Sequence, residues 1–355
     1  MRQLALSSWM LAALLCAACS SSDPDLKNPG SSWPPSPTVT AHRGASSLRP
    51  EHTLEAYRKA IEDGADSIEP DLVSTRDGVL VARHENEISS TTNVATLAQY
   101  AGRKTIKTVD GVAIEGWFTE DFTLLELKQL RARERIPANR PANTAYNDQF
   151  AIPTLQEVID LVAQESRARN RVIGLVPELK HSTYFKSIDL PMEPRLVQVL
   201  DANGYKGADA AVLIQSFEVG NLKELRAMAG YRLVQLVDEP AKAPYDAVAA
   251  GSALTYADMI TPGGLKQVAA YATVVSPYKT IVIPRDAAGE LARPTRFVSD
   301  AHAVGLAVHT WTMRPENPFL PPSLRAAPAD SPSTRGNAVA EIRAYLDAGV
   351  DGVFS

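Results

Sequence analysis

Short apolar segments alternate with helical segments along most of the chain after residue 37, and this alternation restricts the fold more than any other feature. It is typical of an α/β protein with a parallel sheet. Two further strand-like runs, 258–262 and 280–284, leave the strand number open, but eight main strands favour a closed (β/α)8 TIM barrel over an open sheet. The expected strands are 38–43, 67–73, 171–180, 210–217, 231–237, 272–277, 306–312 and 351–355.

Residues 86–149 lack this alternation and contain a single helical run, at 119–135. We interpret them as a small insertion after the second strand of one domain that spans 38–355. The chain has 355 residues, of which 45% are hydrophobic, and this is enough for one large core. Its only two Cys lie before residue 20, so no disulfide is expected in the domain.

The N-terminus has the pattern of an exported lipoprotein. An apolar run at 4–18 follows the single charge of Arg2 and is too short to span a bilayer well. Small residues precede Cys19, although Cys16 stands where such signals usually have Leu. We predict a lipoprotein-type signal peptide over 1–19, a lipid on Cys19 that anchors the protein to a membrane, and a periplasmic location. The alternative is an ordinary cleaved signal.

Residues 20–37 are rich in Ser, Pro and Asp and contain few apolar side chains. This composition predicts a disordered tether between the lipid anchor and the domain. The formal net charge of -5 and the pI of about 5.8 give no sign of a basic surface. Nucleic acid is therefore not an expected partner.

Polar side chains stand at the ends of the predicted strands, where barrels of this class carry function. Glu69 and Asp71 are two positions apart in one strand, so both point to the same face. Glu178 and Lys180 repeat this spacing in the next strand. The candidate site residues are His42, Arg43, Glu69, Asp71, His84, Glu178 and Lys180.

Three carboxylates that face one point would repel one another unless a divalent cation lies between them. Oxygen ligands alone favour Ca2+ or Mg2+ over Zn2+. Arg43 and Lys180 are suited to a phosphate group, and His42 and His84 could transfer protons near neutral pH. The set therefore indicates metal-assisted cleavage of a phosphodiester.

Structural interpretations of the same residues stay open. Glu69 and Asp71 could pair with nearby arginines, and Glu178 could pair with Lys180. Glu51 could cap the helix that follows, which is the interpretation we prefer for it. Trp311 is expected in the core.

Two stretches resemble the glycerophosphodiester phosphodiesterase family. "HRGASSLRPEHTLEAY" at 42–57 is similar to its opening signature, His-Arg-Gly followed by Pro-Glu-Asn-Thr. "GADSIEPDLVSTRDGVLVARHE" at 64–85 is similar to its Glu-x-Asp, Thr-x-Asp-Gly and His-Asp run. The motifs "IPTLQEVI", "PELK", "IQSF", "HTWT" and "GVDGVFS" follow in the family's order, so the resemblance covers about 38–355. The insertion looks most like the periplasmic bacterial branch.

The resemblance implies a barrel enzyme that hydrolyses small glycerophosphodiesters to glycerol 3-phosphate and an alcohol. It implies His42 and His84 as the acid–base pair and places Arg43 and Lys180 at the phosphate. The implied metal ligands are Glu69, Asp71 and Glu178, and the periplasmic branch implies Ca2+ rather than Mg2+. We retain two alternatives: a phospholipase D-like barrel that acts on intact phospholipid, and a non-catalytic surface-binding lipoprotein.

The chain departs from the family's pattern at four points. His52 replaces the Asn of Pro-Glu-Asn-Thr, and Glu85 replaces the Asp after His84. Pro70 stands between two implied metal ligands and cannot donate to a strand ladder. The sequence ends at Ser355, where the pattern continues with Asp-x-Pro and a closing helix. None of these departures removes an implied catalytic residue.

Overall fold

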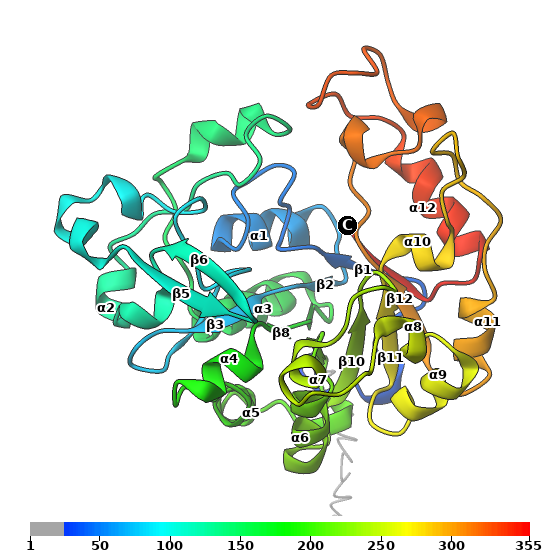
Figure 1. Ribbon diagram of the computed structural model, residues 1–355, viewed down its shortest axis with the longest axis horizontal. Coiled ribbons are helices and arrows are strands. Elements are labelled where there is room, and N and C mark those ends of the chain that lie inside the picture. The colour runs from blue at the N-terminus through cyan, green and yellow to red at the C-terminus, as the bar shows by residue number, and fades with distance from the viewer. Residues whose placement is uncertain (1–24) are drawn as a thin grey trace, which may run out of the picture.

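The computed structural model describes residues 25–355, which form a ring of parallel strands surrounded by helices (Figure 1). Hydrogen-bonded neighbours follow the order β4-β3-β8-β9-β10-β11-β12-β13-β1-β2-β7. β2 (Ser67–Ile68) and β3 (Asp71–Ser74) are two parts of one strand, as are β7 (Gly174–Leu175) and β8 (Glu178–Leu179). Because β2 pairs with β7 and β3 with β8, the two ends of the order meet and the sheet closes. The predicted (β/α)8 barrel is confirmed.

The remaining barrel strands come from the predicted apolar segments. They are β1 (Thr38–Ala41), β9 (Leu213–Ser216), β10 (Arg232–Val237), β11 (Val274–Pro277), β12 (Ala307–Thr310) and β13 (Gly352–Phe354). Pro70 and Pro177 lie at the breaks within the second and third barrel strands, because proline has no N–H to donate. Their carbonyls still accept from Glu178 N (3.1 Å) and Gln215 N (2.9 Å), so the ladder continues past each break.

Helices cover the outside of the barrel (Figure 1). The two strand-like runs at 258–262 and 280–284 belong to this helical layer, which leaves the barrel with its eight strands. Within residues 25–355, no helix is long and apolar enough to cross a membrane. The outer helices are α1 (Leu54–Glu62), α3 (Leu155–Arg169), α4 (Ser182–Ser187), α5 (Glu193–Ala202), α6 (Gly220–Met228), α7 (Tyr245–Ala249), α8 (Tyr256–Met259), α9 (Pro262–Val268), α10 (Lys279–Val282), α11 (Phe297–His302) and α12 (Ala338–Asp347).

The insertion follows the second barrel strand, after the returning strand β4 (Leu80–Ala82). It contains a hairpin of β5 (Thr105–Val109) and β6 (Val112–Gly116), one short α-helix, α2 (Leu124–Leu127), and four 3-10 helices. The helix predicted over 119–135 is wrong beyond α2. Isolated bridges pair Arg131 with Ala151 and Ala132 with Thr92, and these extended pairings replace the helix there.

The predicted disordered tether is wrong for its described part, residues 25–37. Trp33 is only 4% exposed and packs with Val176 and Leu213 inside the barrel. A side chain on Gly174 would collide with the Trp33 ring, so the glycine makes room for it. Since Gly174 begins β7, Trp33 closes the barrel at the amino ends of the strands. The predicted signal peptide over 1–19, the lipid on Cys19 and residues 20–24 lie outside the described residues and stay predictions.

Candidate active site

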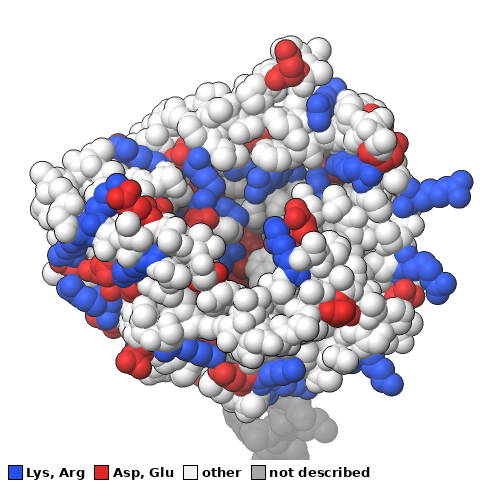
Figure 2. Space-filling view, in the orientation of Figure 1, with Lys and Arg blue, Asp and Glu red and all other residues white. Residues whose placement is uncertain are grey.

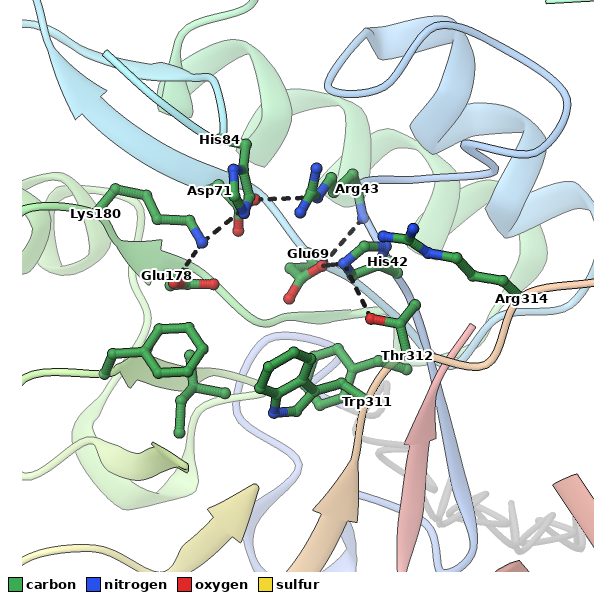
Figure 3. Close-up of a pocket in the computed structure, with 13 residues that line it drawn as sticks. His42, Arg43, Glu69, Asp71, His84, Glu178, Lys180, Trp311, Thr312 and Arg314 are labelled. Carbon is green, nitrogen blue, oxygen red and sulfur yellow. Dashed lines mark hydrogen bonds and ion pairs between the residues drawn. The ribbon is translucent and has the colours of Figure 1, made fainter. Parts of the chain in front are cut away.

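A cavity opens at the carboxyl ends of the barrel strands, and all seven candidate residues line it (Figure 3). The structure thus brings together side chains from four different segments of the chain. Trp311, which we expected in the core, also faces this cavity. The other lining residues are Phe217, Leu236, Thr312, Arg314 and Phe354.

The turn after β1 presents His42 and Arg43 to the cavity. Arg43 has a φ of 61° and Gly44 a φ of 82°, so the chain turns sharply here. A Cβ on Gly44 would lie 2.8 Å from the backbone of Ala56, which explains the glycine in the His-Arg-Gly segment. The backbone N–H of Arg43 donates to Glu69 Oε2 at 3.1 Å and so ties the turn to the second barrel strand.

Glu69, Asp71 and Glu178 each offer a carboxylate oxygen, and these oxygens lie within 4.8 Å of one another. All three residues are buried. Burial, Asp71 and Glu178 hold the pKa of Glu69 well above its usual value. Burial raises the pKa of Glu178 to about 8. The charged form of three buried carboxylates this close together is unfavourable, because each is removed from water and repels the other two.

Two uncharged side chains hold these carboxylates in place. His52 Nε2 donates to Asp71 Oδ2 at 2.9 Å, while its Nδ1 bonds the Tyr57 hydroxyl at 2.8 Å. Gln215 Nε2 donates to Glu69 Oε1 at 2.7 Å. His52 therefore does the work of an amide donor at the position where the family signature has Asn.

Lys180 lies against the carboxylates, 2.5 Å from Glu178 Oε1 and 3.9 Å from Asp71 Oδ2 (Figure 3). Although burial opposes it, Lys180 together with His52 keeps the pKa of Asp71 well below its usual value. The pairing of Glu178 with Lys180, one of the structural alternatives, is thus present. This pairing does not occupy every carboxylate oxygen of the group, since Asp71 Oδ1 is buried without a partner.

A chain of alternating charges connects the two sides of the cavity. Arg43 contacts Glu51 at 3.1 Å, Glu51 contacts Arg135 at 2.7 Å, and Arg135 contacts Glu85 at 2.6 Å. Glu85 accepts from His84 Nδ1 at 2.5 Å. Our preferred interpretation of Glu51 as a helix cap is wrong: Thr53 caps α1 through its hydroxyl, and Glu51 is buried between two arginines.

Both candidate imidazoles are neutral in this environment. Burial and the neighbouring Arg43 and Lys180 lower the pKa of His84 to about 3. Burial, Arg43 and Arg314 hold the pKa of His42 well below its usual value. Since Glu85 accepts from His84 Nδ1, the other ring nitrogen of His84 is left for the cavity. His42 Nε2 lies 3.4 Å from the Thr312 hydroxyl and 4.0 Å from Glu69.

The carboxylate group fits a divalent metal ion. Its oxygens are close enough to share one cation, and Asp71 Oδ1 is buried without a hydrogen-bond donor. A cation among them would compensate the charges that burial and mutual repulsion disfavour. Three carboxylates leave further coordination positions for a substrate oxygen or water.

Comparisons with known proteins point to one family. Residues 42–355 match the model of the glycerophosphoryl diester phosphodiesterase family. A glycerophosphodiester phosphodiesterase of Arabidopsis thaliana is 34% identical over 296 residues, which cover 80% of this chain and 76% of the relative. The glycerophosphodiester phosphodiesterase of Haemophilus influenzae is 28% identical and covers 88% of each chain. A solved phosphodiesterase of Oleispira antarctica, in complex with the product sn-glycerol-3-phosphate, has the same fold with a TM-score of 0.56, 21% identity and coverage of 90% and 93%.

Proposed function

Because the chain belongs to the glycerophosphoryl diester phosphodiesterase family and is therefore a phosphodiesterase, we propose that it converts glycerophosphodiesters to glycerol 3-phosphate and an alcohol. The observation that carries this proposal is a single cavity that joins three buried carboxylates, two imidazoles and Arg43. No one of these groups is specific alone. Together they supply a metal site, proton transfer and phosphate binding.

We assign Glu69, Asp71 and Glu178 as the metal ligands. A divalent cation held by these three residues would supply positive charge to the phosphate and to the attacking oxygen. We propose Ca2+ rather than Mg2+, because the ligand set is all carboxylate and the resemblance is to the periplasmic branch. Ca2+ also accepts irregular coordination by six to eight oxygens.

Arg43 binds the phosphate, and the chain of charges fixes where its guanidinium lies. Glu51 and Asp71 both face Arg43, at 3.1 and 3.6 Å, so its charge is oriented before the substrate arrives. Lys180 provides a second cation on the opposite side of the carboxylates (Figure 3). Both cations neutralise charge that builds on the phosphate oxygens in the transition state.

One imidazole, in its neutral form, removes a proton from the nucleophile, which is water or the 2-hydroxyl of the glycerol. The other must first bind a proton, and as an imidazolium it gives that proton to the leaving alcohol. Glu85 holds the ring of His84 through Nδ1, and Thr312 and Glu69 lie beside His42 Nε2. Each ring is therefore oriented by a neighbour before reaction.

The test is coupled detection of glycerol 3-phosphate from glycerophosphocholine with the purified protein. His42→Ala and His84→Ala should each lower kcat by several powers of ten, because general acid–base transfer contributes about 10²–10⁴. His302→Ala is the matched control, since this half-exposed imidazole on α11 pairs with Asp351 away from the cavity. Rates near those of the wild type in both active-site variants would end the proposal.

Choline release from the same substrate and from two phospholipids separates the two alternatives. A phospholipase D-like enzyme would release choline from phosphatidylcholine or sphingomyelin and not from glycerophosphocholine. A non-catalytic binding protein would release nothing from any of them, with or without metal. Turnover of the small diester that stops with chelator is the result expected from the carboxylate group.

A further inference from the structure

Two grooves leave the catalytic cavity, and they differ in charge. One groove is lined by carboxylates and aromatic rings from the loops near α4 and α7, with Lys242 as its only cation outside the cavity itself. The other, the basic groove, contains four cations and no carboxylate in its lining. These four residues are Lys279, Arg285, Arg314 and Arg325. Figure 2 shows Lys and Arg side chains along the upper edge of the central hollow.

The positive charge of the basic groove is only partly compensated. Lys279 Nζ and Arg285 Nη2 share one carboxylate, Glu341, at 2.9 and 2.5 Å. Arg285 Nη1 is buried without a partner. The Nε of Arg325 donates only to the carbonyl of Leu320, at 3.2 Å. One buried carboxylate thus stands behind four cations, in a protein whose net charge is -5.

Arg314 joins the basic groove to the catalytic cavity, because it lines both. Among residues 25–355 its side chain makes no hydrogen bond or ion pair; it stacks 4.7 Å over the ring of Phe319. Burial, Arg43 and Arg140 lower its pKa to about 10. Glu316, a nearby carboxylate, is bonded to Arg140 at 2.6 Å. A desolvated guanidinium without a counterion is costly, so this position favours an anion.

One phosphate at the carboxylate group cannot account for the whole groove. The reacting phosphate already has Arg43 and Lys180 beside the proposed metal site. Lys279, Arg285 and Arg325 line the groove and not the cavity, so they are placed to contact a part of the substrate beyond the reacting phosphorus. The opposite groove carries carboxylates that would repel an anion, which directs a second anionic group toward Arg314.

We propose that the basic groove binds a second phosphate group, carried by the alcohol of the substrate. The preferred substrates are then glycerophosphodiesters whose alcohol is itself phosphorylated. This inference rests on the proposed function and adds the substrate class. Guanidinium groups suit such a ligand because their N–H donors match phosphate oxygens.

The test compares glycerophosphoglycerol with the same compound phosphorylated on its terminal glycerol. We expect wild-type kcat/KM to be about tenfold or more higher for the phosphorylated compound, since one charge-assisted hydrogen bond is worth that factor. The double variant Arg285→Gln, Arg325→Gln should lower this ratio several-fold, while Lys279 and Arg314 remain in the groove. The double variant keeps Lys279 as a partner for Glu341. The single variant Arg325→Gln changes an exposed position and should lower the ratio less.

Arg296→Gln is the matched control, because its side chain, directly before α11, is 88% exposed and lies outside the groove. It should leave the ratio at the wild-type value. The subsite would be overturned by equal kcat/KM for the two substrates in the wild type, or by an unchanged ratio in both groove variants. Hydrolysis of glycerophosphoglycerol in the same experiment would still support the proposed function. Failure to hydrolyse either compound would overturn both.

Discussion

His52 shows how a residue that departs from a family signature can retain its purpose. Its ring fills the space between Tyr57 and Asp71 and donates to the Asp71 carboxylate. It is fully buried, and burial keeps its pKa below the usual value, so the ring is a neutral donor. A residue that donates a hydrogen bond to a metal ligand fixes the orientation of that ligand, and metal affinity therefore depends on it.

Replacing His52 tests this purpose. His52→Ala should weaken metal binding about 10- to 100-fold, because Asp71 loses its orienting hydrogen bond. His52→Asn should lose less, since an amide can still donate to Asp71. Calorimetric titration of chelator-treated protein with Ca2+ measures both affinities. Equal affinity in the wild type and His52→Ala would show that Asp71 is positioned without this contact.

For single residues, the sequence predicted the site residues at strand ends. It did not predict the residues that contact and orient them. Strand periodicity brought Glu69, Asp71, Glu178 and Lys180 to one face, and all four line the cavity. Arg135 and Arg314 gave no such signal, because they come from the insertion and from a loop without periodicity. The signal that was available for Glu51 was its place in the stretch 42–57, which resembles the family's opening signature. Its position just before the helix favoured the capping interpretation instead. The catalytic and metal-binding roles stay predictions.

At the scale of elements, the segment at 25–37 belongs to the barrel although its composition predicts disorder. Lys27 O accepts from Ala211 N at 2.8 Å, and Arg232 Nη2 donates to Gly30 O at 2.7 Å. Trp33 then fills the end of the barrel opposite the active site. A Ser- and Pro-rich composition indicates a low propensity for helices and strands. It does not predict that a single large side chain, Trp33, will be buried in the barrel.

Removal of the Trp33 side chain should therefore destabilise the barrel. Trp33→Ala should lower the free energy of unfolding by about 3–5 kcal/mol, the usual cost of a large buried aromatic side chain. The kcat of the folded fraction should stay unchanged, because the catalytic cavity lies at the other end. Chemical denaturation with parallel activity assays measures both.

Ile106→Ala is the control for that variant, since Ile106 on the exposed hairpin is 66% accessible. It should change the unfolding free energy by less than about 0.5 kcal/mol. A Trp33→Ala protein as stable as Ile106→Ala would mean that the N-terminal segment does not contribute to the fold.

For the molecule as a whole, the eight strands could be predicted because a buried parallel sheet needs short apolar segments at regular intervals. Closure of the sheet depends on the pairing of β13 with β1, at opposite ends of the domain, and no local pattern encodes that pairing. The interior also buries several neutral histidines, among them His309 on β12, whose Nδ1 has no partner. Such groups make the stability of the barrel depend on pH.

His309 provides the clearest case, because burial lowers its pKa from 6.5 to about 4. The unfolded chain binds this proton below pH 6.5 and the folded chain only below about 4, so stability is complete above 6.5 and falls as pH falls to 4. The loss for this group alone is about 3 kcal/mol. His309→Gln should reduce the slope of unfolding free energy against pH by about one proton between 6.5 and 4. An unchanged slope would contradict the neutral, buried state of His309.

The central claim is that Glu69, Asp71 and Glu178 hold one divalent cation on which hydrolysis depends. The most direct measurement is glycerol 3-phosphate release from glycerophosphocholine by chelator-stripped protein during titration with Ca2+, for the wild type and Glu69→Gln. We predict that the stripped wild type is inactive and recovers fully with Ca2+, while Glu69→Gln recovers only in part at high Ca2+. Full activity of the wild type in excess chelator would contradict the claim.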